Sequence, residues 1–295
     1  MPAMTSPRFI HLRLHSEYSV TDGIVRLGDA VKAAAADGMP ALALTDLANL
    51  FGLVKFYSAA RGKGIKPVAG ADVWIADPEA PDAATRLLLL VRNKAGYLQL
   101  CELLSRAYLV EGRRDRAEIR REWLAEVGCD GLIALSGAQQ GDVGEALAHG
   151  NPALAAARAR AWAALFPGAF YLEVQRYGQP QQEASVRQTA ALAAELGLPL
   201  VATHPVQFMK RDDFRAHEAR VCIAEGYVLG DSRRPRPYTA EQYFKSQAEM
   251  AEAFADLPEA LANTVEIARR CNLELTLGKN FLPDFPTPEG MSLAD

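Results

Sequence analysis

The sequence has no long apolar run, no closely spaced cysteines and no excess of basic charge. No uninterrupted apolar stretch approaches the roughly 20 residues of a membrane span, and the first residues, MPAMTSPRFI, lack the pattern of a secretion signal. The four cysteines form no CxxC pair, which excludes a disulfide framework or a zinc knuckle and indicates reduced thiols: Cys101, Cys129, Cys222 and Cys271. We therefore expect a soluble cytoplasmic protein without a membrane segment.

The charge balance and the absent motifs exclude several function classes. The chain has 32 basic and 36 acidic residues, a net charge of −4, so its bulk surface is not a basic clamp for nucleic acid. It contains no Walker loop, no GxSxG elbow and no Rossmann glycine pattern. Nucleotide binding of the P-loop or Rossmann type and serine-hydrolase chemistry are therefore not expected.

Short apolar runs alternate with longer helical patterns along the first 203 of the 295 residues. Strands are expected over residues 8–14, 41–45, 67–75, 86–91, 131–135, 169–174 and 199–203. The absence of a hairpin signal favours a parallel α/β fold, and the strand count favours an irregular seven-stranded (βα) barrel, similar to a TIM barrel, over an open sheet.

The remaining residues form a helical extension and a connector. The pattern becomes helical from about residue 212, and Pro258 lies in the first turn of a helix expected over 256–271. Residues 281–295 are proline-rich and cannot form a packed helix or a central strand. We expect a barrel domain over 1–280, followed by a connector over 281–295 that leads into a further part of a longer protein.

Several polar residues follow the predicted strands, and in a barrel these positions meet at one mouth. They include histidines and carboxylates, which bind zinc or manganese in metallohydrolases. The alternative is that they are mouth residues that bind nothing. The set comprises His11, Arg13, His15, Glu17, Asp22, Asp46, Asp72, Arg86, Tyr177, His204 and Gln207.

Several long blocks of the sequence resemble a known family. They are FIHLRLHSEYSVTDG, MPALALTDLANLFGLVKFY, GIKPVAGADVWI, LIALSGAQQGDVG, GLPLVAT and EALANTVEIARRCNL. Together they resemble the PHP (polymerase and histidinol phosphatase) domain, and more narrowly the N-terminal PHP domain of bacterial DNA polymerase III α subunits. The resemblance runs from about residue 8 to residue 286 and implies an irregular seven-stranded (βα) barrel, which a polymerase palm follows in the chain.

Active members of this family bind up to three metal ions at the barrel mouth, but this sequence departs from their ligand pattern. His15 and Asp22 remain, and Asp72 replaces a longer glutamate. The other ligand positions carry residues that are not strong metal ligands. The positions that the resemblance marks as a vestigial metal site are Arg13, His15, Asp22, Leu47, Asp72, Arg86, Ala138, Tyr177, Pro205 and Gln207.

Two of the substitutions bring permanent positive charge. A catalytic metal needs at least three converging protein donors, and guanidinium groups do not deprotonate in proteins. Buried carboxylates without metal need another partner. We therefore predict that Arg13 and Arg86 occupy the volume of the missing metals and pair with Asp22, Asp46 or Asp72. The alternative is that both arginines point into solvent.

The resemblance then implies a catalytically inactive PHP barrel that binds no cofactor itself. The parent protein would be a DNA-directed DNA polymerase (a nucleotidyltransferase) that holds magnesium in its palm and contacts DNA mainly through its polymerase part. The barrel would support the palm and thumb and dock the separate proofreading exonuclease, the ε subunit. The alternatives are an active metal-dependent phosphoesterase or 3′–5′ exonuclease, and a purely structural module without a partner of its own.

Overall fold

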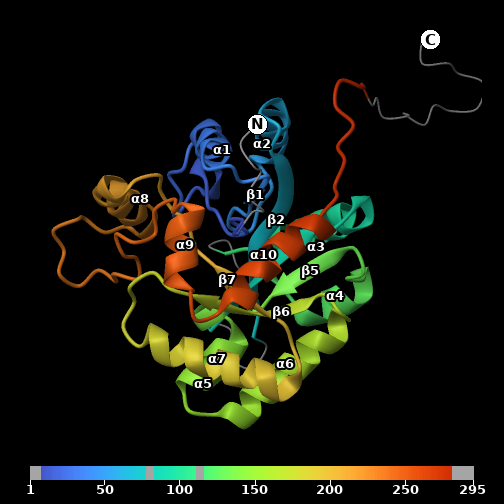
Figure 1. The fold of residues 1–295 in the computed structure, drawn as a ribbon, viewed down its shortest axis with the longest axis vertical. Coiled ribbons are helices and arrows are strands. Elements are labelled where there is room, and N and C mark those ends of the chain that lie inside the picture. The colour runs from blue at the N-terminus through green and yellow to red at the C-terminus, as the bar shows by residue number, and fades with distance from the viewer. Residues whose placement is uncertain (1–7, 78–82, 111–115, 281–295) are drawn as a thin grey trace, which may run out of the picture.

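Seven strands form one curled sheet in the computed structural model, which describes residues 8–77, 83–110 and 116–280 (Figure 1). The strand order is β1-β2-β3-β5-β6-β7, and the short β4 pairs with β2. The strands are β1 (Ala41–Leu44), β2 (Lys66–Ile75), β3 (Thr85–Val91), β4 (Glu118–Ile119), β5 (Leu132–Leu135), β6 (Phe170–Gln175) and β7 (Leu200–Thr203). The α/β class with a barrel-like sheet is therefore confirmed. The predicted connector over 281–295 lies outside the described residues.

The expectation of an all-parallel sheet is wrong at β3. This strand pairs antiparallel with both β2 and β5, whereas the β1–β2, β2–β4, β5–β6 and β6–β7 pairs are parallel. A parallel crossover needs a dozen or more residues, usually with a helix. The connection between β2 and β3 spans only residues 76–84, so the chain can only return antiparallel.

Helices cover the outside of the sheet, and their sequences explain where they begin and end. Asn93 accepts a hydrogen bond from the Gly96 N–H at 3.0 Å and caps α3, while Pro152 stands in the first turn of α6. The α-helices of the described residues are α1 (Leu27–Ala36), α2 (Leu53–Gly62), α3 (Lys94–Leu109), α4 (Arg121–Val127), α5 (Asp142–Ala148), α6 (Pro152–Leu165), α7 (Gln182–Leu196), α8 (Phe214–Glu225), α9 (Gln247–Ala253) and α10 (Pro258–Arg270). None of them is both long enough and apolar enough to cross a bilayer.

The predicted first strand, residues 8–14, is not a regular strand. Its hydrogen bonds go partly to side chains, because Thr264 Oγ1 accepts from the Ile10 N–H at 3.0 Å and Thr45 Oγ1 accepts from the Leu14 N–H at 2.9 Å. These side-chain acceptors replace the backbone partners of a continuous ladder. The segment still contacts both edges of the sheet, since the Ala43 N–H donates to the His11 carbonyl and Leu14 forms an isolated bridge with Val206.

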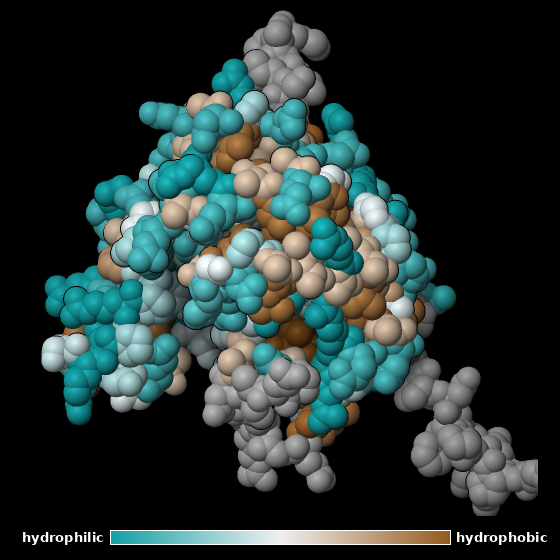
Figure 2. Space-filling view, turned by 90° about the horizontal axis from the view of Figure 1, so that it is seen from below, coloured by the Kyte–Doolittle hydropathy of each residue, from teal (hydrophilic) through white to brown (hydrophobic). Residues whose placement is uncertain are grey.

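Glycine allows close packing between a helix and the sheet. A Cβ atom at Gly96 would lie 1.8 Å from the Gly131 carbonyl oxygen, so α3 can approach the start of β5 only with glycine at this position. Figure 2 views the molecule from the side of α5 and α7 and shows pale-brown apolar surface bordered by hydrophilic side chains. This distribution matches the alanine-rich sequence of α6, PALAAARARAWAAL.

Candidate functional site

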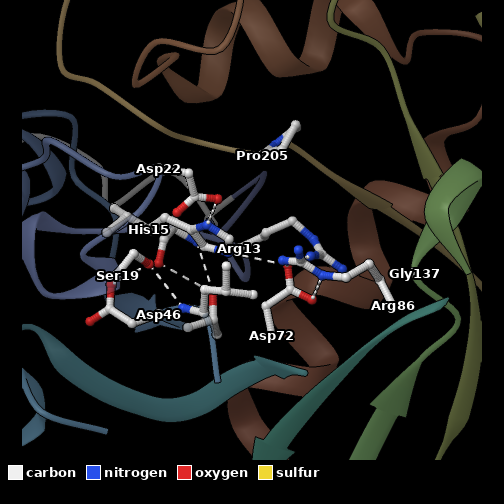
Figure 3. Close-up of polar contacts among 12 residues, drawn as sticks. Arg13, His15, Ser19, Asp22, Asp46, Asp72, Arg86, Gly137 and Pro205 are labelled. Carbon is white, nitrogen blue, oxygen red and sulfur yellow. Dashed lines mark hydrogen bonds and ion pairs between the residues drawn. The ribbon is translucent and has the colours of Figure 1, made fainter. Parts of the chain in front are cut away.

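Five of the predicted site residues meet at the barrel mouth. Figure 3 shows Arg13 and Arg86 directed at Asp72, with His15 and Asp22 beside them. Asp72 lies in β2, and Arg86 is the second residue of β3. Arg13 lies near the end of the irregular segment 8–14, and His15 and Asp22 follow it. All five are buried, with at most 6% of each residue exposed. Besides His15, the set consists of two arginines and two aspartates, which are charged side chains. Such burial requires partners for every charge.

Asp72 is the centre of this cluster. Its carboxylate accepts hydrogen bonds from Arg13 Nη1, from Arg86 Nη2 and, at 3.2 Å, from Arg86 Nε. Burial alone would raise the pKa of the Asp72 carboxyl, but the two guanidiniums hold that pKa well below its usual range. The Arg86 guanidinium also stacks on the Trp74 ring, 4.4 Å from the ring centroid, which fixes its orientation.

Glu173 is a member of the cluster that the sequence analysis did not identify. It accepts two hydrogen bonds from Arg13, from Nε at 3.0 Å and from Nη2 at 2.9 Å. The Gly137 N–H, Gln175 Nε2 and Thr203 Oγ1 donate to the same carboxylate. The available signal was an acidic residue inside the otherwise apolar strand FYLEV of β6, because a buried acid needs a cationic partner.

His15 links Asp22 to Asp72. Its Nδ1 lies 2.9 Å from Asp22 Oδ2, and its Nε2 lies 3.1 Å from Asp72 Oδ2. Burial alone would lower the pKa of His15, but these carboxylates outweigh burial and raise it from 6.5 to about 9. The ring is therefore protonated at neutral pH and donates from both nitrogens. Burial would raise the pKa of Asp22, but the neighbouring His15 lowers it.

Asp46 lies beside the cluster but pairs with serines rather than arginines. Its carboxylate accepts from the Ser16 N–H at 2.6 Å, from Ser16 Oγ at 3.0 Å and from Ser19 Oγ at 3.2 Å. Burial raises the pKa of Asp46 despite these donors. Asp46 therefore holds the turn after His15 in place, whereas the two guanidiniums of the mouth pair with other carboxylates.

The charges of the buried cluster balance. Three cations (Arg13, His15 and Arg86) face three carboxylates, of which Asp72 contacts all three cations. Asp22 pairs with His15, and Glu173 pairs with Arg13. We refer to these six residues as the mouth network: Arg13, His15, Asp22, Asp72, Arg86 and Glu173. The network is therefore neutral, and each of its charged side chains contacts an opposite charge.

The other predicted positions surround the network, and among them Gln207 contributes a donor, because its Nε2 lies 3.5 Å from Asp22 Oδ2. Leu47 and Ala138 carry apolar side chains, and the Leu47 N–H donates to Ser19 Oγ at 2.9 Å. A polar cavity of about 40 Å³ lies above the network, and Tyr177, Pro205 and Gln207 line it together with Pro237 and Tyr238. The last two belong to the segment between α8 and α9, which covers the mouth and which the sequence analysis did not place there.

The residues present do not fit the metal ions that the resemblance associates with this site. Both oxygens of Asp72 already accept from guanidinium groups, and Leu47, Ala138 and Pro205 have no side-chain donor atom. Two guanidiniums would also repel an entering divalent cation. Across 8–77, 83–110 and 116–280, no group of three or more His, Cys, Asp or Glu side chains is arranged to hold a metal ion.

The curled sheet and its mouth define an α/β protein of the PHP type. A model of the PHP domain family matches residues 11–177, more than half of the chain, and the chain belongs to this family. Its sequence is 58% identical over 294 residues to the DNA polymerase III subunit alpha of Neisseria meningitidis serogroup A, and 49% identical over 292 residues to that of Escherichia coli K12. These matches cover 99% of this chain, but only 26% and 25% of the two relatives.

The chain therefore corresponds to the PHP region of DNA polymerase III alpha subunits and spans about a quarter of the length of these curated relatives. Among solved structures, an amidohydrolase from Chromobacterium violaceum is 16% identical with a TM-score of 0.46, over 72% of this chain and 96% of its own.

Proposed function

We propose that this chain is a metal-free, phosphoesterase-inactive PHP domain that supports a replicative DNA polymerase in the cytoplasm. The observation that carries the proposal is the pairing of Arg13 and Arg86 with Asp72. Both arginines stand at positions where the active family has metal ligands, and they neutralise the carboxylate that a metal would need. The same contacts hold β2, β3 and the segment 8–14 together, which is a structural role.

The covered mouth also supports an inactive domain. A cavity of about 40 Å³ accommodates a few water molecules, whereas pockets for small-molecule ligands measure several hundred Å³. Thr239 Oγ1 donates to the Tyr177 carbonyl, and Gln179 Nε2 donates to the Pro237 carbonyl at 2.5 Å, so the covering segment is bound on the barrel side. A nucleotide 3′ end would have to displace this segment to reach the network.

The second part of the proposal is that the barrel supports the polymerase palm and thumb and docks the proofreading exonuclease subunit. The support is the identity of about half or more of its residues to DNA polymerase III alpha subunits along nearly the whole chain. In this proposal, DNA and magnesium are bound by the polymerase part of the longer protein.

Elemental analysis together with a nuclease assay tests the first part. The chain is purified without chelator, its metal content is measured, and it is incubated with a 3′-labelled oligonucleotide in zinc or manganese. We expect substoichiometric metal and no release of nucleotides. Two or three bound ions per chain together with cleavage would establish the competing function, an active metal-dependent phosphoesterase or 3′–5′ exonuclease. A failure to bind the exonuclease subunit would instead indicate a purely structural module.

A further inference from the structure

A long groove runs along α1 on the outside of the barrel, away from the mouth network. It consists of two hollows of about 550 Å³ and 530 Å³ that share Ile24 and Arg26. The first is lined by residues of the turn at Glu17–Ser19, the chain before α1, α2 and α8, and the second by residues of α1 and of the chain before α8. Figure 1 shows where these elements lie. We call the two hollows together the α1–α8 groove. Each hollow alone has the volume of a small-molecule pocket, and side by side the two offer a more extended surface.

The first hollow carries unbalanced positive charge. Arg26, Lys55 and Arg220 line it together with a single carboxylate, Glu17. Glu17 lies 3.9 Å from Arg26 Nη1 and 3.6 Å from Lys55 Nζ, so it is shared between two cations. Arg220 Nε is buried and has no hydrogen-bond partner among the described residues. This excess is local, because the whole chain has a net charge of −4.

Exposed apolar side chains lie close in the chain to residues that line this hollow, such as Lys55 and Arg220. Phe51 is 66% exposed and Val54 is 57% exposed at the start of α2, beside Lys55. Val20 follows the turn at Glu17–Ser19, and Ile223 lies one helical turn after Arg220 on α8. Exposed apolar side chains that gather beside a groove are typical of protein-binding sites.

We propose that the α1–α8 groove binds a partner peptide that carries acidic and large apolar side chains. The acidic residues would pair with Arg220, Lys55 and Arg26, and the apolar residues would cover Phe51, Val54 and Ile223. Phosphates would offer the exposed apolar side chains no apolar contact, and this favours a protein partner over DNA.

This inference rests on the docking part of the proposed function, and it assigns a surface to it. The test measures the affinity of the purified exonuclease subunit for the chain and for two groove variants, Val54→Asp and Arg220→Glu. Two variants with matched chemistry serve as controls: Leu98→Asp, at a 56% exposed position of α3, and Arg187→Glu, at an exposed position of α7. Thermal melts verify that all four variants are folded.

We expect each groove variant to weaken binding by about tenfold or more, as at interface hot spots, and each control to bind like the unmodified chain. If the unmodified chain binds the exonuclease and the groove variants bind equally well, the groove assignment is wrong while the docking proposal stands. If the unmodified chain does not bind the exonuclease, both the docking proposal and the groove assignment are wrong. If a single-stranded oligonucleotide binds with an affinity that Arg220→Glu reduces and Val54→Asp does not, the groove is a nucleic-acid site and the inference is overturned.

Discussion

Replacing Arg13 with alanine tests whether the mouth network holds the barrel together. The substitution removes two hydrogen bonds to Glu173, at 3.0 and 2.9 Å, and the contact with Asp72. Both carboxylates are at most 1% exposed, so neither can recover its lost partner from bulk water. Removing one partner of a buried ion pair costs about 3–5 kcal/mol, because it leaves an uncompensated charge. We expect a loss of this size in the free energy of unfolding.

The assay is urea unfolding together with a thermal melt. At roughly 2 °C per kcal/mol for a chain of this length, the melting temperature should fall by about 6–10 °C. Arg26→Ala is the matched control, because the Arg26 side chain is 77% exposed and lies 3.9 Å from Glu17. Exposed pairs of this kind contribute little to stability, so the control should melt like the unmodified chain.

A double variant separates the cost of an unpaired buried charge from the cost of lost packing. Arg13→Ala combined with Glu173→Gln removes one of the unpaired carboxylates, so the double variant should be more stable than the sum of the two single losses predicts. If Arg13→Ala unfolds at the same urea concentration as Arg26→Ala, the arginine does not hold the network. The structural role proposed for it would then be refuted.

Two further predictions concern the pH dependence and the packing. Burial would lower the pKa of His15, but its carboxylate neighbours raise it to about 9. The protonated ring therefore contributes stability that is complete below about pH 6.5 and is lost as pH rises through 9, so the free energy of unfolding should fall by up to about 3 kcal/mol over that interval. A His15→Gln chain that shows the same fall would contradict this assignment. Gly96→Ala should destabilise the chain strongly, because the new Cβ would overlap the Gly131 carbonyl. Gly62→Ala should instead stabilise α2 by about 0.5–1 kcal/mol, because no atom lies within 4 Å of the new Cβ. Equal melting temperatures of the two variants would show that α3 can move away from β5.

The sequence was sufficient to predict most helices and the alternation of buried strands, because each depends on local periodicity. The direction of β3 was not predictable in this way. It depends on the length of the connection over 76–84, and the apolar run of β3 reads the same for a parallel or an antiparallel strand. The loss of a regular strand at 8–14 depends on Thr45 and Thr264, which are distant in sequence.

The candidate site shows the same limit. The resemblance identified Arg13, Asp72 and Arg86 as residues at ligand positions, and the structure brings these three together. The resemblance did not identify Glu173, because the role of this acid in β6 becomes apparent only once the fold places Arg13 opposite it. The cover formed by Pro237 and Tyr238 depends on how a loop without regular structure folds back over the barrel, and no sequence period encodes that.

The contact between Ile10 and Thr264 has a consequence for how the protein is made. The two residues are 254 positions apart, so the first segment emerges from the ribosome long before its acceptor exists. At about 5–20 residues per second, synthesis leaves the Ile10 N–H without this acceptor for roughly 13–50 seconds. Segment 8–14 can contact β1 early, but its other partners, Val206 and Thr264, are synthesised late, so a chaperone would have most to protect while these partners are missing.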